Sequence, residues 1–269
     1  MNTSILSLGI SLAAPPKEVF CALTDAVEHS SFTGAKSVID ARNGGEFSYF
    51  GGSVFGVFRE VFGPSRIVQS LRAADWPDGY TATVDQRLEP RGGGKCTFVV
   101  VREDGIPTSH LETVIEGWAS YWDKLSDYLR ERRLDLVRRF VEKYKNEHDW
   151  DSVDEFIAAD CKVHIPISGL PQGREGMRVN GRTICAAFPD VTVTREFFAT
   201  EADIVVERAH ARATHQGELM GIPPTGRSVT WTELHAYRID NGEISEVWSE
   251  PDLLGLMVQL GAFKPLGRQ

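Results

Sequence analysis

The chain has 269 residues, of which 42 % are hydrophobic and 25 % are charged, and its formal net charge is −9. This composition is typical of a globular protein, and the length suffices for two ordinary domains. The acidic excess is spread over both halves, so no basic surface predicts binding to nucleic acid or to an anionic membrane. Cys21, Cys96, Cys161 and Cys185 lie far apart without CxxC spacing, which disfavours a zinc site and a disulfide framework.

The start of the chain does not look like a targeting segment. The run "MNTSILSLGISLAAPPKEVF" lacks the basic region and the long apolar stretch of a signal peptide. No part of the chain approaches the roughly 20 apolar residues of a membrane span. Together with unpaired cysteines, which are typical of a reducing compartment, these features predict a cytoplasmic protein.

The first half predicts a short helix, a series of strands and a long helix. Prolines precede the helix of "APPKEVFCALTD", where their missing N–H groups do no harm. Strand-like runs follow at 36–40, 45–52, 53–61, 65–72, 80–88 and 95–101. Their short Gly- and Pro-containing connections predict an antiparallel meander. Apolar residues at three- and four-residue steps then predict an amphipathic helix over 112–132, which a curved sheet would enclose.

The second half starts a new pattern. Two helices are expected at 130–144 and 150–160, and a short closing helix at 252–261. Strand-like runs lie between them at 161–167, 191–198, 203–214, 228–239 and 243–249. A domain boundary is therefore expected near Arg132, which divides the chain into residues 1–132 and 133–269.

Several segments of the first half resemble a known family. They are "SLAAPPKEVFCALTD", "SFTGAKSVIDARNGGEFSYFGG", "RIVQSLRAADWPDGY" and "EGWASYWDKLSDYL", in that order. They resemble the C-terminal domain of the activator of the heat-shock-ninety ATPase, within the SRPBCC helix-grip superfamily. The resemblance implies an antiparallel sheet around a long C-terminal helix, with a cavity between them. It does not imply co-chaperone activity, because the activator's other domain has no counterpart here.

The second half resembles the SnoaL-like polyketide cyclases. The segments that carry the resemblance are "GREGMR", "FPDVTV", "THQGELMGIPPTGRSVTW", "RIDNGEISEVW" and "DLLGLMVQLG". This resemblance implies the α+β cone fold of nuclear transport factor two. The fold class expected for the whole chain is therefore α+β, a helix-grip domain fused to such a cone domain. Some members of the family close a polyketide ring by intramolecular aldol condensation without a cofactor.

The motif inventory agrees with chemistry that needs no cofactor. The sequence has no P-loop, dinucleotide fingerprint, HExxH or GxSxG motif, so no metal or organic cofactor is expected. An aldol closure requires removal of an acidic C–H proton and protonation of the resulting alkoxide. A carboxylate in an apolar pocket is suited to the first step, because desolvation raises its pKa.

A hairpin signal sets the expected geometry of the site. Asn241-Gly242 is the strongest two-residue hairpin signal. Pairing about this turn places His235 opposite Trp248, Tyr237 opposite Glu246, and Glu233 opposite Glu250. Alternation puts all of these on one strand face together with Trp231. His235 and Glu250 would then be diagonal neighbours.

The resemblance implies acid/base roles for His235 and Asp252, with Glu250 as a substitute. Ser249 is a departure, because some cyclases have an aspartate directly after the tryptophan. A structural histidine and a helix cap at Asp252 are the alternative reading. The side chains expected to bind substrate are His164, His215, Trp231, Trp248 and Tyr237. For His164 and His215, bonding to the local backbone or loop is the competing explanation.

These observations predict a cofactor-independent acid/base enzyme that acts on a small hydrophobic carbonyl compound. Polyketide cyclisation of the aldol type, or isomerisation, is the expected reaction. The alternative is a non-catalytic protein that binds hydrophobic ligands or acts like a co-chaperone. No nucleic acid or membrane partner is expected, and association into a homo-oligomer through the C-terminal half is left open.

Overall fold

The computed structural model describes residues 2–263. They divide into two compact units, which follow one another along the chain with the junction between Glu131 and Arg132. No helix in the described part of the chain is long and apolar enough to cross a membrane.

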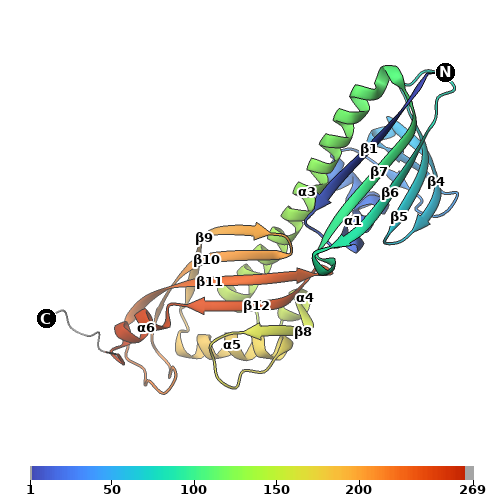
Figure 1. The fold of residues 1–269 in the computed structure, drawn as a ribbon. Coiled ribbons are helices and arrows are strands. Elements are labelled where there is room, and N and C mark those ends of the chain that lie inside the picture. The colour runs from blue at the N-terminus through green and yellow to red at the C-terminus, as the bar shows by residue number, and fades with distance from the viewer. Residues whose placement is uncertain (1, 264–269) are drawn as a thin grey trace. The chain divides into compact units, whose positions relative to one another are not determined.

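The first unit is a seven-stranded antiparallel sheet with a long helix (Figure 1). Its strand order is β1-β7-β6-β5-β4-β3-β2, so each strand from β2 to β7 pairs with its neighbour in sequence, as predicted for a meander. The strands are β1 (Thr3–Leu12), β2 (Val38–Ile39), β3 (Glu46–Tyr49), β4 (Val54–Phe62), β5 (Arg66–Ala73), β6 (Ala82–Arg91) and β7 (Cys96–Pro107). The helices are α1 (Pro16–Thr24), α2 (Ala26–Thr33) and α3 (Leu111–Val141), with 3-10 turns at Phe50–Gly52, Gly92–Gly94 and Thr108–His110.

Local chemistry explains where the first helices begin and end. Pro16 occupies the first turn of α1, where no backbone donor is needed. The Asp25 carboxylate then accepts hydrogen bonds from the backbone N–H groups of Val27 and Glu28, which caps α2. Gly34 ends α2 with φ +73°, a conformation that glycine adopts without steric cost.

Helix α3 contributes to the cores of both units. Trp122, Leu125 and Leu129 are buried against the sheet of the first unit. Val137 and Phe140, later in the same helix, belong to the core of the second. The two helices predicted at 112–132 and 130–144 are therefore one. The reason is that the run "RERR" between them contains good helix formers and neither glycine nor proline.

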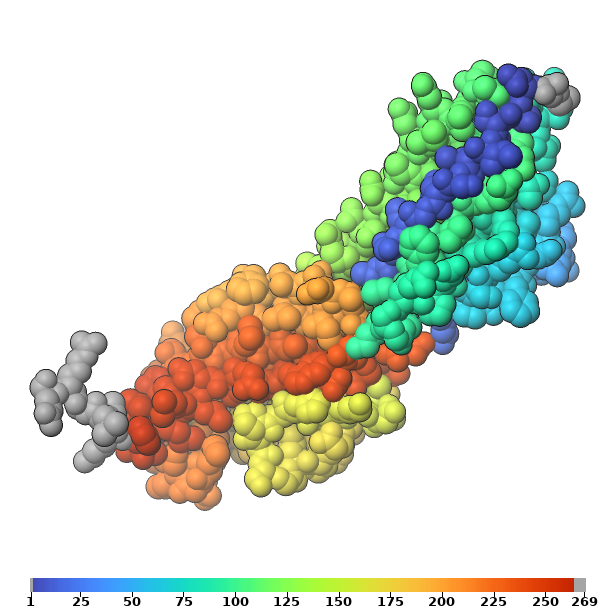
Figure 2. Space-filling model, in the orientation of Figure 1, coloured from blue at the N-terminus to red at the C-terminus, as the bar shows by residue number. Residues whose placement is uncertain are grey.

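The second unit is a five-stranded sheet in the order β8-β12-β11-β10-β9. Its strands are β8 (Ile157–His164), β9 (Thr192–Glu201), β10 (Ile204–Thr214), β11 (Ser228–Asp240) and β12 (Glu243–Pro251). The helices are the π-helical turn η4 (Glu142–Asn146), α4 (Val153–Phe156), α5 (Gly173–Ala187) and α6 (Leu253–Leu260). On the face shown in Figure 2, bands from yellow through red to orange follow the strand order from β8 to β9.

In this unit one predicted helix is much shorter than expected, and one helix has no counterpart among the predicted elements. The helix expected at 150–160 has only four residues, because the β-rich run from Ile157 pairs in parallel with β12. Helix α5 was not predicted. Its first turn has positive φ at Gly173 and tight backbone packing at Gly176, so glycine, a poor helix former, obscures the helical pattern. The fold class itself, α+β with an antiparallel sheet around a long helix in the first half, is confirmed.

The register of the β11–β12 hairpin follows the prediction only beside the turn. Ile239 pairs with Ile244, which is the register that a two-residue turn at Asn241-Gly242 sets. Ser245 is then an extra residue, a β-bulge, and every later pair moves by one position. His235 consequently faces Ser249, and Tyr237 faces Val247. The predicted pairs of His235 with Trp248, Tyr237 with Glu246 and Glu233 with Glu250 are wrong, because a one-residue shift turns side chains to the opposite face.

Candidate functional site

An apolar cavity of about 160 Å³ lies inside the second unit, between its sheet and its helices. The sheet contributes side chains of β11 and β12 that alternate along each strand. Helix α6 contributes two leucines, and α5 contributes a mixed set that includes Met177, Asn180 and Ile184. The lining includes Tyr144, Met177, Ile184, Cys185, Phe188, Trp231, Glu233, His235, Tyr237, Val247, Ser249, Pro251, Leu253 and Leu256. Strands β11 and β12 each present three or four successive same-face residues to it.

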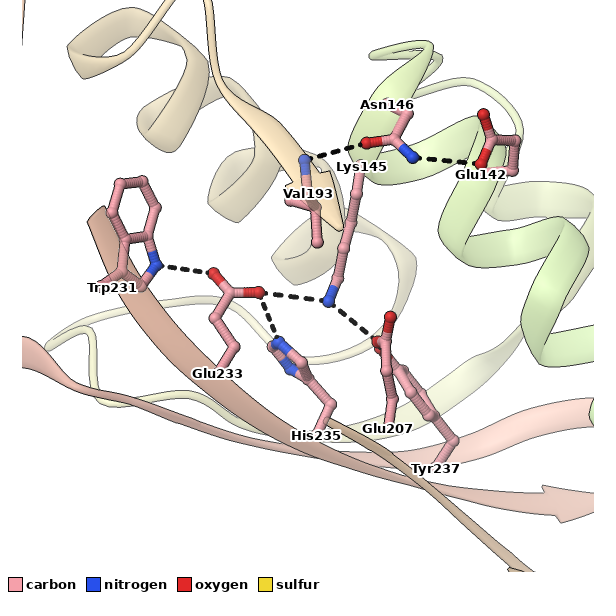
Figure 3. A network of polar contacts seen from close by, with 9 residues as sticks. All are labelled: Glu142, Lys145, Asn146, Val193, Glu207, Trp231, Glu233, His235 and Tyr237. Atoms are coloured by element: carbon pink, nitrogen blue, oxygen red, sulfur yellow. Dashed lines mark hydrogen bonds and ion pairs between the residues drawn. The ribbon is translucent and has the colours of Figure 1, made fainter. Parts of the chain in front are cut away.

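A lysine reaches this cavity from the turn that follows α3. The Lys145 ammonium lies 2.9 Å from Glu207 Oε2 and 3.2 Å from Glu233 Oε2 (Figure 3). Its side chain is only 9 % exposed, and that of Glu207 is fully buried. The Tyr237 hydroxyl also donates to Glu207 Oε2, at 3.0 Å. Charges this well buried are stable only when they are paired, so Lys145 and the two carboxylates act as a unit.

Glu233 is the centre of the network. Its Oε1 accepts a hydrogen bond from Trp231 Nε1 at 2.8 Å, and its Oε2 contacts both Lys145 and His235 Nε2, the latter at 2.8 Å. Burial raises the pKa of the Glu233 carboxyl, but the charge of Lys145, followed by His235 and Trp231, outweighs burial. The pKa therefore lies well below the usual range, and Glu233 is a carboxylate at neutral pH.

The ionised Glu233 orients the imidazole of His235. A carboxylate can only accept, so neutral His235 carries its proton on Nε2 and keeps a free lone pair on Nδ1. Within residues 2–263, Nδ1 has no hydrogen-bond partner. The ring also stacks on Tyr237, with a centroid separation of 6.1 Å. A histidine in this state can accept a proton at Nδ1, and Glu233 stabilises the imidazolium that forms.

Ser249 lies directly across the sheet from His235. The two residues are register partners, both are buried, and both line the cavity. The position where some cyclases carry an aspartate therefore faces the cavity in this chain, but it provides a hydroxyl and not a carboxylate.

Two residues expected to perform acid/base chemistry lie elsewhere. Glu250 is exposed and does not line the cavity, because the bulge at Ser245 turns it to the opposite face from His235. Asp252 is also exposed, and its carboxylate accepts the backbone N–H of Gly255 at 2.8 Å, which caps α6. The expected convergence of Glu250 and Asp252 on His235 is therefore wrong, and the helix-cap reading describes Asp252.

Of the five expected substrate-binding residues, the structure places two at the cavity, Trp231 and Tyr237. His164 is exposed, stacks on Trp248 and contacts Glu246 Oε1 at 2.9 Å, so His164 and Trp248 form a separate cluster on the opposite face of β12. The reason is again the bulge, which turns Trp248 outward.

His215 is buried behind the cavity wall. Its Nδ1 accepts the backbone N–H of Thr225 and contacts the Thr225 hydroxyl at 3.1 Å, which holds the loop from 215 to 226. Phe188 packs between His215 and Trp231, with centroid separations of 5.4 Å and 5.1 Å, and so separates His215 from the cavity. The loop-orienting role is the one the contacts support.

Sequence reasoning did not select Lys145, Glu207 or Glu233 as site residues. Glu233 could have been found, since it alternates with Trp231 and His235 on one strand face. Lys145 carries no comparable signal, because it lies about 90 positions before its partner Glu233. In the described residues, no three His, Cys, Asp or Glu side chains are arranged to hold a metal ion.

Comparison with known proteins yields a separate match for each half. A family described as activator of Hsp90 ATPase homolog 1-like protein matches residues 13–130, and a family described as SnoaL-like polyketide cyclase matches residues 135–260. The activator of 90 kDa heat shock protein ATPase homolog 1 from Homo sapiens is 28% identical over 120 residues, which are 45% of this chain and 35% of the relative. The chain thus spans about a third of the length of that activator.

The second half matches proteins of similar length to itself. The aklanonic acid methyl ester cyclase DnrD from Streptomyces peucetius is 31% identical over 132 residues, which are 48% of this chain and 90% of the relative. The solved structure of TsrD from Streptomyces laurentii is 29% identical, with a TM-score of 0.46, and covers 50% of this chain and 98% of TsrD. The chain belongs to the SnoaL-like polyketide cyclase family through residues 135–260 and carries an Hsp90 ATPase activator-like domain at residues 13–130.

Proposed function

We propose that the second half is an acid/base enzyme that acts, without a cofactor, on a small hydrophobic carbonyl compound. The proposed reaction is ring closure of a polyketide by intramolecular aldol addition, or a related isomerisation. The observation that carries this proposal is the hydrogen-bonded pair of Glu233 and His235 on the wall of an apolar cavity. Membership in the cyclase family and the match to DnrD support the reaction class.

In this proposal His235 transfers the proton in both directions. Its Nδ1 removes a proton from a carbon between two carbonyl groups, whose acidity is already raised by both. The enolate carbon attacks a further carbonyl carbon, more distant in the same substrate, and forms the ring C–C bond. The alkoxide produced at that carbonyl takes the proton back from the imidazolium. His235 ends neutral, and the substrate is isomerised without gain or loss of atoms.

The neighbouring groups have supporting roles. Glu233 stabilises the imidazolium, and Lys145 is a positioning residue that keeps Glu233 ionised. The Ser249 hydroxyl faces the cavity beside His235, where it can donate to the oxygen that becomes negatively charged. Trp231 and Tyr237 form apolar walls for the substrate rings.

Aklanonic acid methyl ester, named for the Streptomyces relatives, is the first compound to test. Ring closure would be followed by chromatography and mass spectrometry as a product of unchanged mass. His235→Gln is expected to lower the rate about 100-fold or more, the usual contribution of a general base. Glu233→Gln is expected to lower kcat and to shift the pH profile, because a neutral amide no longer stabilises imidazolium.

His210→Gln is the matched control, since His210 is an exposed histidine of the same sheet that pairs with Glu196 outside the cavity. If the wild type closes the ring and His235→Gln does so at the same rate, His235 is not the base. Binding of the ester without turnover, or without exchange of its acidic hydrogens for deuterium, would favour a ligand-binding protein.

A second candidate function rests on residues 13–130 alone. Their match to Hsp90 ATPase activators favours an interaction with an ATPase of that class. The direct test is whether the full chain changes the ATP hydrolysis rate of a purified Hsp90. An unchanged rate, and no complex by sedimentation, would exclude this candidate.

A further inference from the structure

The first unit contains a second cavity, of about 500 Å³, between its sheet and the first turns of α3. This volume is in the range of pockets that hold small organic ligands. Five aromatic side chains form much of its wall, namely Tyr49, Phe50, Trp76, Trp118 and Tyr121. Such walls suit a ligand built of planar rings.

One group of polar side chains beside this cavity is fully paired. His29 is buried, and its ring nitrogens contact the Ser37 hydroxyl at 2.8 Å and the Tyr121 hydroxyl at 3.0 Å. The ring stacks on Tyr49 with a centroid separation of 4.2 Å. These contacts fix Tyr121 and Tyr49 as rigid parts of the wall.

A second polar group in the same wall is not fully paired. Gln69 Nε2 donates to the Tyr49 hydroxyl at 2.6 Å, and Gln86 Nε2 donates to Gln69 Oε1 at 3.2 Å. The chain of hydrogen bonds stops there, because the buried Oε1 of Gln86 has no partner among the described residues. Gln86 is 4 % exposed, and a buried amide oxygen without a partner is costly.

Glu103 adds a second hydrogen-bond acceptor to the same wall of the cavity. In the register of β5, β6 and β7, Val84 pairs with both Gln69 and Glu103, so Gln69, Gln86 and Glu103 share one sheet face. Trp118 Nε1 donates to Glu103 Oε2 at 2.7 Å. The lining contains Asp75 and Glu103 but no lysine, arginine or histidine, so an anionic ligand would find no counter-charge.

We propose that this cavity is a binding site for an uncharged aromatic ring compound with a hydroxyl group, and that the hydroxyl pairs with the Gln86 amide. The ring walls and the unpaired amide are independent observations that lead to the same ligand class. The proposal does not depend on the function proposed for the second half.

A hydroxyl also suits the amide in either orientation. If the amides of Gln69 and Gln86 are both turned over, the Tyr49 hydroxyl donates to Gln69, Gln69 donates to Gln86, and the unpaired atom is the Gln86 N–H. A hydroxyl donates to the oxygen or accepts from the nitrogen. An ammonium group can only donate and a carboxylate can only accept.

The test is calorimetric titration of the full chain with 2-naphthol and with 2-methylnaphthalene, which has the same shape but no hydroxyl. Gln86→Leu is expected to weaken 2-naphthol about tenfold, the effect of losing one buried hydrogen bond, and to leave 2-methylnaphthalene unchanged or tighter. The anion 2-naphthoate is expected to bind the wild type at least about tenfold more weakly than 2-naphthol does, because no cation lines the cavity.

A second variant tests whether the naphthalenes bind inside this cavity. Gly117 of α3 lines this cavity, and a Cβ built there meets no atom within 4 Å. Gly117→Leu therefore places a side chain in open space and is expected to abolish binding of both naphthalenes. The substitution also replaces a poor helix former with a good one, so the helix itself should persist. Circular dichroism and the thermal transition serve as checks of folding.

Three outcomes would overturn the proposal. The first is 2-naphthol affinity that survives Gly117→Leu, since the ligand would then bind elsewhere. The second is a Gln86→Leu variant that weakens both naphthalenes equally. The third is tighter binding of 2-naphthylmethylammonium than of 2-naphthol, combined with its loss in Glu103→Gln, which would identify a cation site.

Discussion

Replacement of Lys145 by methionine should unfold the second unit at markedly lower temperature. Lys145 is the only cation that contacts both Glu207 and Glu233 among the described residues. Methionine has a similar length but no charge, so the variant leaves two carboxylates in a buried site without their partner. Glu207, which is fully buried, would keep one hydrogen bond, from Tyr237.

The expected loss in the free energy of unfolding is about 3–5 kcal/mol, the range for removing one partner of a buried ion pair. At an unfolding entropy of about 2.1 cal/mol/K per residue, a unit of roughly 130 residues would melt about 11–18 °C lower. The loss should shrink as the pH falls. The pKa of Glu233 is depressed in the wild type, so its stabilising contribution is present at neutral pH and is lost when the pH falls below the usual value of 4.5 towards the folded-state pKa.

Denaturant and thermal unfolding of the full chain at pH 7 and at pH 4 would measure this. The transition of the first unit is an internal reference, since it contains none of the network residues. Lys162→Met is the matched control, because Lys162 is an exposed lysine of the same unit. Adding Glu207→Gln to Lys145→Met should restore part of the loss. A change below about 1 kcal/mol, the size of a surface pair, or a change independent of pH would refute this reasoning.

Three further predictions concern other parts of the chain. Burial lowers the pKa of His29 from 6.5 to about 4, so unfolding takes up a proton between these two pH values. The free energy of unfolding of the first unit should therefore fall by about 3 kcal/mol from pH 6.5 to pH 4. Denaturant unfolding at several pH values should show this fall in the wild type and not in His29→Gln. Asp252→Ala removes the cap of α6 and should lower the stability of the second unit by about 1 kcal/mol, while ring-closure activity stays intact. An activity loss larger than that of an equally destabilised control variant would show that Asp252 has a catalytic role. Fragments 1–132 and 133–269, the predicted domains, should each show one cooperative transition in calorimetry, and a fragment that stays unfolded would contradict that division.

The fold was predictable because its elements follow simple periodicities. Alternating apolar residues identify most strands, and the three- and four-residue steps after Leu111 identify α3. These signals are local and repeated, so they survive without knowledge of tertiary contacts. Helix α5 was missed because several glycines interrupt its pattern at positions where its backbone packs closely.

The candidate site was predictable only in part, for two physical reasons. An Asn-Gly turn fixes the register beside itself, and nothing in the sequence marks Ser245 as the extra residue that changes it further along. His235, Trp231 and Tyr237 were identified correctly as neighbours because they precede the turn on one strand. Lys145 was missed because only the packing of η4 against the sheet brings it to Glu233.

The bulge at Ser245 has a consequence for how such cavities diversify. Deleting this one residue would leave the later pairs unchanged, because Ser245 is the residue without a partner on β11, and Val247, Ser249 and Pro251 would still face the cavity. A register that keeps Ser245 but pairs it with Arg238 would instead withdraw these three residues and present Glu246, Trp248 and Glu250. Loss of the bulge would thus exchange an entire wall of the pocket, whereas a substitution within the wall changes one side chain. Relatives with and without the bulge should therefore be compared by strand face, and not by aligned position, before their chemistry is inferred.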